Sequence, residues 1–590
     1  MTLRPRRDRP PRDSRGDEFA ALGYKSSAAD APILMVNFLE HIFAQLQNSS
    51  SRVVLREIRG DQFVSVTGQE LLDEVHRARA YVQSVGLQPG DRCALLAPNS
   101  IRWAAIDLAL MAEGLIVVPL YYRQAPAELA AMMRDCEPKL LIASHGALAD
   151  SALQACGGDA RSRPRCVLFD EILRLGEPRR DVNAAPNSRA EAEIVTIIYT
   201  SGTSGEAKGV CLTVGNVTHM LSCTTERLNQ LMGETREPDR VFHYAPFNFA
   251  ASWILLLSCL SRQSVLTLST DLTKLPEEIR LSAPHYFLNV PTLLERVRRG
   301  VNEALAKRPQ PIRKLFAKAS EAWSRKKTGS SRTLDSLWLA LGRRLIFSQV
   351  KARFGSHLRA LICGSAPLAP ETQEFFLMLG ITVLQAYGLT ETTAICTLDD
   401  PRIPVEPGYV GQVIPGIEMR IGENEEILVR GPNIFAGYWN RVDETARVLR
   451  DGWLHTGDQG EVSGRGNWRI IGRIKNLIIL NSGHNVAPEP IEDRIAQRLP
   501  AAQHVVIVGN GRGYLCAIVA GRVEKDAMQA ALDAVNAGLP HYRQIRNFAM
   551  VEESFTAENG LLTANGKLRR EAINARFASV IEAMYDRKPS

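Results

Sequence analysis

Short apolar runs alternate with helix-like segments in the first quarter of this 590-residue chain. The apolar run "RCALLAP" (92–98) leads into the helix-like "SIRWAAIDLALMAEG" (100–114), and "LIVVPL" (115–120) follows. A second helix-like segment, "PAELAAMMRD" (126–135), precedes a third apolar run, "KLLIAS" (139–144). Buried strands that alternate with helices are typical of βαβ units, which build parallel sheets. The pattern therefore predicts an α/β fold.

The same alternation returns near the middle of the chain. The apolar "LRALICG" (358–364) is followed by the helix-like "ETQEFFLMLG" (371–380) and the apolar "ITVLQAYGLTE" (381–391). In open α/β sheets, ligands bind beyond the carboxyl ends of the strands. We therefore expect "GSAP" (364–367) and "YGLTE" (387–391) to lie at a ligand site.

The chain is too long for one hydrophobic core, so we expect at least two domains. Glycine-rich alternating runs after about residue 417 indicate a β-rich subdomain, and the last 115 or so residues look like a small α+β module. We predict a disordered basic arm (1–34), a large domain of parallel α/β sheets with the β-rich subdomain (35–474), and a small mobile C-terminal lid domain (475–590).

The ten cysteines are scattered and contain no C-x-x-C pair, which indicates reduced, mostly buried thiols in a cytoplasmic protein. The longest apolar runs are far shorter than the roughly 20 residues that span a bilayer. We therefore expect no membrane-spanning segment.

The formal net charge of +7 is unevenly distributed. A basic insert, residues 296–353, has sixteen Lys and Arg but only three Asp and Glu. Within it, five apolar residues recur at three- and four-residue steps and predict an amphipathic helix over 334–347: Leu334, Leu337, Trp338, Leu341 and Leu345.

Such a helix could pack on the large domain, or its cationic surroundings could contact an anionic membrane or another polyanion. We expect weak, salt-sensitive peripheral membrane binding that falls on charge reversal at Arg325, Lys326 and Lys327. No nucleic-acid partner is expected.

The segment "YTSGTSGEAKG" (199–209) combines glycines, hydroxyl side chains and one lysine. Backbone N–H groups, hydroxyls and a flexible cation suit phosphate oxygens. The order of residues does not match G-x-x-x-x-G-K-[ST], which argues against an ordinary P-loop. On its own, the segment fits either a phosphate-binding loop or a Gly/Ser surface turn.

Four further segments follow this loop in a fixed order: "YGLTETT" (387–393), "GWLHTGD" (452–458), "GRIKNLIILNSGHNVAPEPIE" (472–492) and "LTANGKL" (562–568). With them, the sequence from about residue 35 to the end resembles the adenylate-forming superfamily. The insert before 354 and the long "NLIILNSGHNVAPEPIE" resemble the long-chain fatty acyl-CoA synthetases within it.

The resemblance implies an ATP-dependent ligase for medium- to long-chain fatty acids. It would form acyl-AMP with ATP and Mg²⁺, and then pass the acyl group to coenzyme A, releasing AMP. Two alternatives remain open: an acyl-AMP ligase that loads a carrier protein, and a non-enzymatic basic scaffold that binds membranes.

The resemblance also implies roles for individual residues. Lys567, Thr390 and Glu391 would be catalytic, with Glu391 as the Mg²⁺ ligand; Lys475 would be the hinge, and Ser482 and Gly483 would line the coenzyme A tunnel. The residues expected to bind ATP or AMP are Thr200, Ser201, Gly202, Thr203, Ser204, Gly205, Lys208, Gly364, Ser365, Ala366, Pro367, Gln385, Ala386, Tyr387, Gly388, Asp458 and Arg473.

One position departs from the long-chain pattern. Phe249, in "APFNFAAS" (245–252), stands where those enzymes commonly carry histidine. Because other branches use an aromatic residue there, adenylation is not threatened, and we place Phe249 in the acyl pocket.

Overall fold

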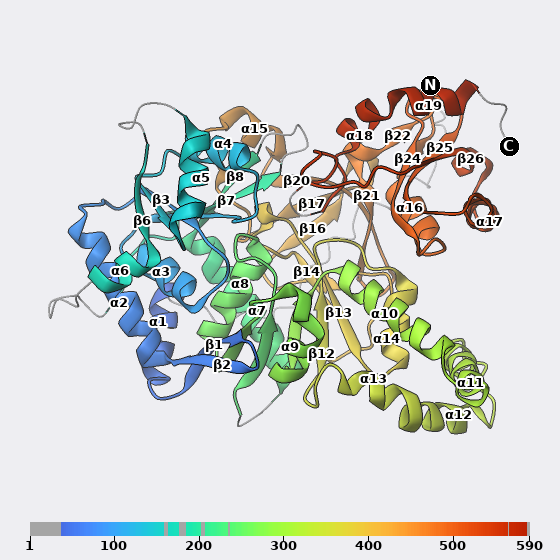
Figure 1. The fold of residues 1–590 in the computed structure, drawn as a ribbon, viewed down its shortest axis with the longest axis horizontal. Helices are drawn as coiled ribbons and strands as arrows, with labels where there is room; N and C mark the ends of the chain where they lie inside the picture. Colours follow the sequence, from blue (N-terminus) through green and yellow to red (C-terminus); the bar gives the residue numbers. More distant parts are fainter. Residues whose placement is uncertain are drawn as a thin grey trace, which may run out of the picture.

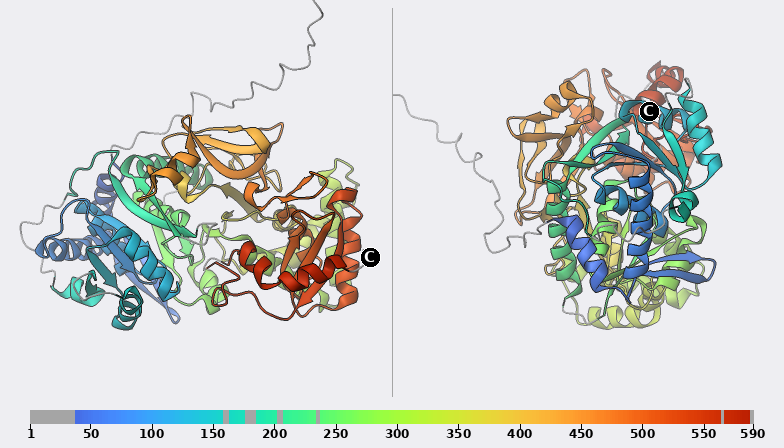
Figure 2. Two further views of the ribbon diagram at one scale, coloured as in Figure 1. Left: turned by 90° about the horizontal axis from the view of Figure 1, so that it is seen from above. Right: turned by 90° about the vertical axis from the view of Figure 1, so that its left-hand side faces the viewer.

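The structure is a computed structural model that describes residues 37–157, 163–175, 185–201, 207–233, 237–563 and 566–586. A large domain with three sheets carries a small domain at the end away from its N-terminal helices (Figures 1 and 2). This arrangement confirms the predicted α/β class. The predicted arm, residues 1–34, lies outside the described residues, and the exact domain limits stay predictions.

The first sheet has seven strands in the order β18-β8-β7-β4-β3-β5-β6. Its strands β3 to β6 pair in parallel, as the apolar runs predict, and β7 and β8 form an antiparallel hairpin. The strands are β3 (Arg92–Leu96), β4 (Ile116–Leu120), β5 (Leu140–Ala143), β6 (Arg165–Leu168), β7 (Ile194–Ser201), β8 (Ala207–Thr213) and β18 (Gly437–Tyr438). The helices that accompany them are α2 (Gly68–Ser84), α3 (Ile101–Ala112), α4 (Pro126–Cys136), α5 (Gly146–Cys156) and α6 (Phe169–Leu175).

The second sheet has nine strands in the order β15-β14-β13-β12-β11-β9-β10-β1-β2. Its centre is parallel and its edges are antiparallel. The strands are β1 (Val53–Arg59), β2 (Gln62–Thr67), β9 (Asp239–His243), β10 (Ser264–Leu268), β11 (Tyr286–Asn289), β12 (Ala360–Cys363), β13 (Thr382–Tyr387), β14 (Thr397–Leu398) and β15 (Gln412–Val413). The helices that accompany them are α1 (Phe38–Asn48), α7 (Val214–Met232), α8 (Ala250–Ser261), α9 (Leu275–Ser282) and α14 (Pro370–Met378).

Two helices of the large domain, α3 and α8, are buried except at Arg102 and, in part, Ala251, which explains their almost uniformly apolar sequences. The Ser100 side chain caps α3 by accepting a hydrogen bond from the Trp103 N–H. A polar contact links the two helices: the Trp253 indole N–H donates to Asp107 Oδ2 at 2.9 Å. The second oxygen of this buried carboxylate has no hydrogen-bond partner among the described residues.

We expect the buried Asp107 to make the protein less stable as the pH rises. Burial raises the pKa of Asp107 to about 7, so the folded chain holds this proton more tightly than the unfolded chain, whose ordinary Asp pKa is about 3.9. Stability contributed by the bound proton is present below pH 4 and is lost as the pH rises from about 4 to 7, by on the order of 4 kcal/mol. Asp107→Asn should therefore lose less stability than the wild type in thermal melts across this range. Parallel pH profiles for the two proteins would contradict the assignment.

The third sheet forms the predicted β-rich subdomain and is antiparallel. It consists of β16 (Glu418–Ile421), β17 (Glu426–Arg430), β19 (Leu449–Arg450), β20 (Trp453–Val462) and β21 (Trp468–Arg473), with α15 (Val442–Val448) beside it. The small domain follows as an α+β unit. Its elements are β22 (Ile478–Ile479), β23 (Asn485–Val486), α16 (Glu489–Ala496), β24 (Ala502–Val508), β25 (Leu515–Gly521), α17 (Lys525–Asn536), β26 (Ile545–Val551), α18 (Arg570–Arg576) and α19 (Ala578–Asp586).

The basic insert is helical and projects from the large domain at the lower right of Figure 1. It comprises most of α10 (Pro291–Ala306), then α11 (Gln310–Lys327), α12 (Asp335–Gly342), a π-helical turn (Arg343–Phe347) and α13 (Ser348–Ala352). Three residues of the predicted stripe face outward, with Leu334, Leu337 and Leu345 at 59%, 51% and 45% exposed, whereas Trp338 and Leu341 are half-buried. The packed face of this segment is instead Asp335, Leu339, Gly342 and Ile346, which recur at three- and four-residue steps, with Phe347 beside them.

Among the described residues, no helix is long and apolar enough to cross a bilayer. All ten cysteines are free thiols, and eight of them are buried.

Candidate active site

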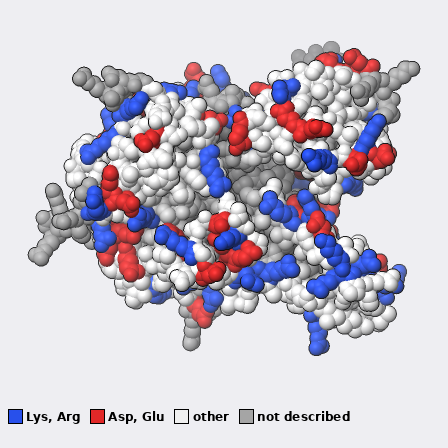
Figure 3. All heavy atoms as spheres, in the orientation of Figure 1, with Lys and Arg blue, Asp and Glu red and all other residues white. Residues whose placement is uncertain are grey.

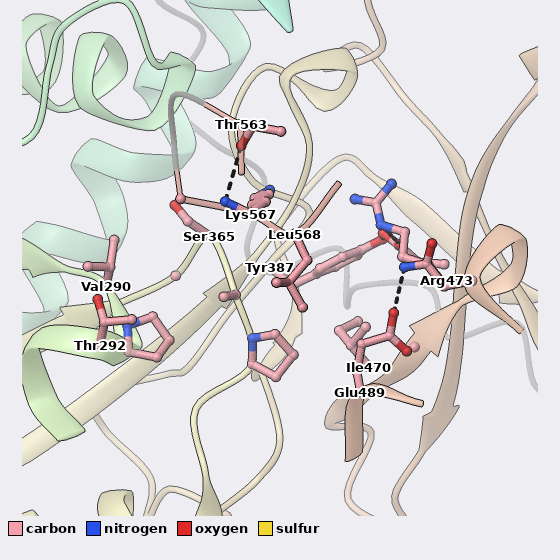
Figure 4. A pocket seen from close by; sticks show the side chains of 18 of the residues that line it. Val290, Thr292, Ser365, Tyr387, Ile470, Arg473, Glu489, Thr563, Lys567 and Leu568 are labelled. Carbon is pink, nitrogen blue, oxygen red and sulfur yellow. Dashed lines mark hydrogen bonds and ion pairs between the residues drawn. The ribbon is translucent and has the colours of Figure 1, made fainter. Parts of the chain in front are cut away.

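A cleft of about 3670 Å³ lies among the nine-stranded sheet, the β-rich sheet and the small domain. The space-filling view shows the molecule hollowed beside the small domain (Figure 3). A close view shows Ser365 and Tyr387 from the large domain near Lys567 and Leu568 from the small domain (Figure 4). Segments about 200 residues apart in the sequence therefore share one cavity.

The segment "YTSGTSGEAKG" connects the antiparallel strands β7 and β8, in which Thr200 pairs with Lys208. Thr200 and Lys208 line the cleft. Ser201 ends β7, but its side chain is not described, and four predicted nucleotide-binding residues lie outside the described residues: Gly202, Thr203, Ser204 and Gly205.

Lys208 is held at the cleft wall by two neighbours. Its ammonium group forms an ion pair with Glu444 and lies 5.3 Å from the ring centre of Tyr438. Hydrogen bonding to Lys208 is the largest cause of the lowered pKa of Glu444. The lysine is thus fixed in position beside the loop by residues that the sequence motifs do not include.

Thr390 and Glu391 lie in a single 3₁₀ turn (Thr390–Thr392) directly after β13. The Tyr438 hydroxyl donates to Glu391 Oε1 at 2.8 Å. The turn is tight: a Cβ on Gly388 would lie 2.3 Å from the Ala394 carbonyl oxygen, so a larger residue does not fit there. Ala394 itself has a φ of 96°, which is strained for a residue with a side chain.

The Glu391 carboxylate suits a Mg²⁺ ion whose other ligands come mostly from substrate phosphates and water. No cluster of three or more His, Cys, Asp or Glu residues able to hold a metal occurs in the described part of the chain. Mg²⁺ commonly binds through one or two carboxylates together with substrate phosphates and water. A single carboxylate that shares the cleft with Lys208 matches this donor set.

Asp458, in β20, is only 2% exposed and lies at the base of the cleft. The Arg473 Nε–H donates to Asp458 Oδ1 at 2.6 Å, and the Tyr387 hydroxyl donates to Oδ2 at 2.7 Å. Burial raises the pKa of Asp458, and the charge of Arg473 opposes this rise most strongly. The three residues form one hydrogen-bonded group, so Tyr387 also orients the carboxylate.

The loop after β12 lines the cleft with Gly364, Ser365, Ala366 and Pro367, and the end of β13 adds Ala386, Tyr387 and Gly388. Gln385 does not line it. Its side chain is buried and donates to Gln373 Oε1 at 2.8 Å and to the Tyr409 carbonyl oxygen at 2.9 Å. The side-chain amide is thus used in a buried network behind the strand, and a nucleotide contact of Gln385 stays a prediction.

Lys567 reaches the cleft from a hairpin of the small domain. The Lys567 N–H donates to Thr563 Oγ1 at 3.1 Å, and the Thr563 N–H donates to the Lys567 carbonyl oxygen at 2.8 Å. Desolvation by the cleft walls lowers the pKa of Lys567, as does the charge of Arg473. Asp458 and Glu391 oppose that shift, so the two carboxylates lie close enough to interact electrostatically with the ammonium group.

The predicted hinge residue, Lys475, lies in a 3₁₀ turn (Ile474–Asn476) at the edge of the cleft. Desolvation lowers its pKa to about 8, with Arg473 and Lys567 acting in the same direction. Ser482 and Gly483 are exposed and do not line the cleft in this orientation of the small domain. Gly483 has a φ of 81° and open space around it.

Phe249 ends the loop before α8 and lines the cleft, 6.2 Å from the ring centre of Tyr121. Tyr121 and Tyr122 line the same wall, although no sequence motif includes them. Leu288, in β11, and Val290, directly after it, extend the apolar surface.

The fold and cleft define an adenylate-forming enzyme. The family model for AMP-binding enzymes matches residues 42–439, and the model for the AMP-binding enzyme C-terminal domain matches residues 475–589; this chain belongs to the AMP-binding enzyme family.

Curated relatives with similar sequences include two fatty-acid enzymes. A long-chain-fatty-acid–CoA ligase of Mycobacterium bovis is 26% identical, with 94% of this chain and 97% of that protein covered. Long chain acyl-CoA synthetase 3 of Arabidopsis thaliana is 27% identical, with 85% and 81% covered.

Solved structures share the fold at lower identity. An anthranilate CoA ligase in complex with anthranoyl-AMP has a TM-score of 0.71 at 18% identity, covering 92% of this chain and 98% of that chain. O-succinylbenzoate CoA synthetase of Bacillus subtilis, with ATP and a magnesium ion, has a TM-score of 0.69 at 20% identity, covering 90% and 98%.

Proposed function

We propose that this protein activates a medium- to long-chain fatty acid with ATP and transfers the acyl group to coenzyme A. The observation that carries the proposal is the meeting of Glu391, Asp458 and Lys567 in one cleft, although they come from three separate segments of the sequence. The apolar wall at Phe249, Leu288 and Val290 suits an alkyl chain, and the curated relatives are named as fatty-acid ligases.

In the first half-reaction, a carboxylate oxygen of the fatty acid attacks the α-phosphorus of ATP, and pyrophosphate leaves. Both reacting groups are anionic, so the site has to screen charge and hold them in line. Lys208 and the adjoining loop bind the phosphates, while Glu391 and Thr390 would hold Mg²⁺, which neutralises phosphate charge when bound. Asp458 accepts hydrogen bonds from the ribose hydroxyls, and Lys567 stabilises the charge that develops between the acyl and phosphoryl groups.

In the second half-reaction, the sulfur of coenzyme A attacks the acyl carbonyl, its proton is lost and AMP leaves. We propose that the small domain rotates about Lys475, which removes Lys567 from the cleft and brings Ser482 and Gly483 to the thiol entrance. Their exposed position in the present orientation is consistent with this movement.

Product analysis tests this proposal against its main alternative. With ATP, Mg²⁺ and a panel of saturated fatty acids, we expect AMP and acyl-CoA to form in equal amounts. Accumulation of acyl-AMP that is transferred to a phosphopantetheinyl carrier protein, but not to coenzyme A, would favour the carrier-loading alternative. No turnover of any acid by protein that binds ATP would favour the scaffold.

We also propose that the basic insert contacts anionic membranes peripherally. Three exposed leucines, Leu334, Leu337 and Leu345, lie on the segment that also exposes Arg343 and Arg344. Lys318 lies over the Trp338 ring at 4.2 Å, and blue side chains gather over α11 and α12 in Figure 3. An apolar stripe flanked by cations is typical of helices that lie in a lipid interface.

The structure changes the choice of variants for this test. Arg325 donates to the buried Asp335 at 2.7 Å and Lys327 pairs with Glu374, so charge reversal there would disturb packing. We expect Arg343→Glu with Arg344→Glu to weaken binding to phosphatidylserine-containing vesicles at least about tenfold, because each cation near anionic lipid contributes about 1 kcal/mol. Adenylation of a water-soluble medium-chain fatty acid should be unchanged.

A triple change of Leu334, Leu337 and Leu345 to serine should weaken vesicle binding as well. Val442→Ser, at an 81% exposed valine outside the insert, is the matched control and should bind like the wild type. The proposed membrane contact would be refuted if the wild type floated equally with neutral and anionic vesicles, or if it floated with neither at low salt.

A further inference from the structure

Two consecutive arginines follow the catalytic-lysine hairpin, and they bind partners in different domains. Arg570 donates to Glu492 Oε1 at 2.7 Å and to Oε2 at 2.6 Å, and it lies 3.6 Å from Glu489. Glu492 is buried and also accepts the Ile507 N–H at 2.7 Å. Because all of these partners belong to the small domain, Arg570 moves with it as one body.

Arg569 instead crosses the cleft. Its Nη2–H donates to Glu128 Oε1 at 2.7 Å, which joins residues 441 positions apart in the sequence. Glu128 lies in the first turn of α4, at the rim of the large domain. This ion pair therefore exists only while the small domain holds its present orientation.

The local structure prepares Glu128 for this contact. Pro126 begins α4, and a carboxylate in the first turn of a helix is stabilised by the helix dipole. The Gln124 side chain donates to the other oxygen, Glu128 Oε2. The carboxylate thus faces the incoming arginine in a fixed rotamer.

We propose that Arg569 and Glu128 are positioning residues that hold the small domain in the orientation in which Lys567 faces the acyl-phosphate site. The inference rests on the proposed rotation of this domain. Arg569 is two residues from Lys567, so any rotation that withdraws Lys567 also separates Arg569 from Glu128. The pair therefore favours the adenylation step and has to break before thioester formation.

The exposure of the pair suits a contact that forms and breaks in each cycle. The side chains of Arg569 and Glu128 are 30% and 35% exposed. Ion pairs that water can reach are weak, and their loss shifts an equilibrium between two orientations about two- to fivefold. A fully buried pair across the cleft would instead oppose rotation, because separating it would leave a desolvated charge without its partner.

Glu128→Gln tests the inference when the two half-reactions are measured separately. We expect fatty-acid-dependent ATP–pyrophosphate exchange to fall two- to fivefold, while acyl transfer from supplied acyl-AMP to coenzyme A stays the same or rises. Exchanging the charges, with Glu128→Arg and Arg569→Glu together, should restore at least half of the lost exchange activity.

Glu553→Gln is the matched control, because it breaks the ion pair between Arg576 and Glu553 inside the small domain, at 3.1 Å. It should change neither half-reaction. The proposal would be overturned if Glu128→Gln lost both half-reactions equally, or lost no ATP–pyrophosphate exchange. It would also be overturned if the variant with exchanged charges did not regain that activity. A wild-type protein without fatty-acid-dependent exchange would instead refute the proposed function itself.

Discussion

Replacing Lys567 with alanine should reduce acyl-AMP formation about 100- to 1000-fold, the range seen when one group that stabilises a developing charge is removed. The lysine is the cation that the small domain brings toward Asp458 and Glu391. Its charge is needed while the phosphorus is attacked, and not while the thiol attacks the finished acyl-AMP. Transfer from supplied acyl-AMP to coenzyme A should therefore stay within about threefold of the wild type.

Rapid-quench assays of each half-reaction measure this split. Lys525→Ala removes another exposed lysine of the small domain, at the start of α17, and should leave both steps unchanged. Equal losses in the two half-reactions of Lys567→Ala would contradict the proposed role, because they would indicate damage to the fold or to substrate binding in general.

Replacing Lys475 with proline should block the second half-reaction and spare the first. Lys475 lies in the first turn of a short 3₁₀ segment, where the fixed φ of proline fits. The same fixed φ prevents the backbone rotation that the proposed domain movement needs. We expect acyl-AMP formation within a few-fold of the wild type and acyl-CoA formation reduced about 100-fold or more, so that acyl-AMP accumulates.

Lys475→Ala is the matched control, because it removes the same ammonium group but leaves φ free. This variant should retain both half-reactions. The pH dependence of their rates should change only as expected from the loss of a group with a pKa of about 8. Normal coenzyme A turnover by Lys475→Pro would contradict rotation about this residue. Loss of thioester formation in both variants would assign the effect to the charge.

The sequence predicted the elements whose patterns are local. Strands β3, β4 and β5 lie within the three apolar runs and α3 within the first helix-like segment, and α4 extends one residue beyond the second. The three strands are buried, Ser100 caps α3 and Pro126 begins α4, so nearby sequence determines these elements. The order of the motifs likewise predicted that Lys208, Glu391, Asp458 and Lys567 serve one site, and all four line the cleft.

The residues that support the site could not be found in the same way. Tyr438 reaches Glu391 only because β18 pairs with β8, and Glu444 reaches Lys208 from the helix that follows. Glu128 meets Arg569 only through the position of the small domain. Such contacts depend on tertiary pairing between distant segments, and no local spacing encodes them.

Two sequence patterns do not show which of their side chains are buried in the folded protein. The hydrophobic period over 334–347 groups Leu334, Leu337 and Leu345, which are exposed, whereas Leu339 and Ile346 on another face of the segment are buried. Gln385 lies within a nucleotide motif, yet its amide is used by buried neighbours. Neither hydrophobic periodicity nor membership of a motif shows which neighbours a side chain contacts in the folded protein.

The central claim is that the shared cleft adenylates a fatty acid, and isotope exchange between pyrophosphate and ATP in the absence of coenzyme A tests it most directly. We predict exchange that requires both Mg²⁺ and a medium- or long-chain fatty acid, and that disappears in Lys567→Ala. Absence of fatty-acid-dependent exchange in folded, ATP-binding protein, or release of ADP in place of pyrophosphate, would contradict the account.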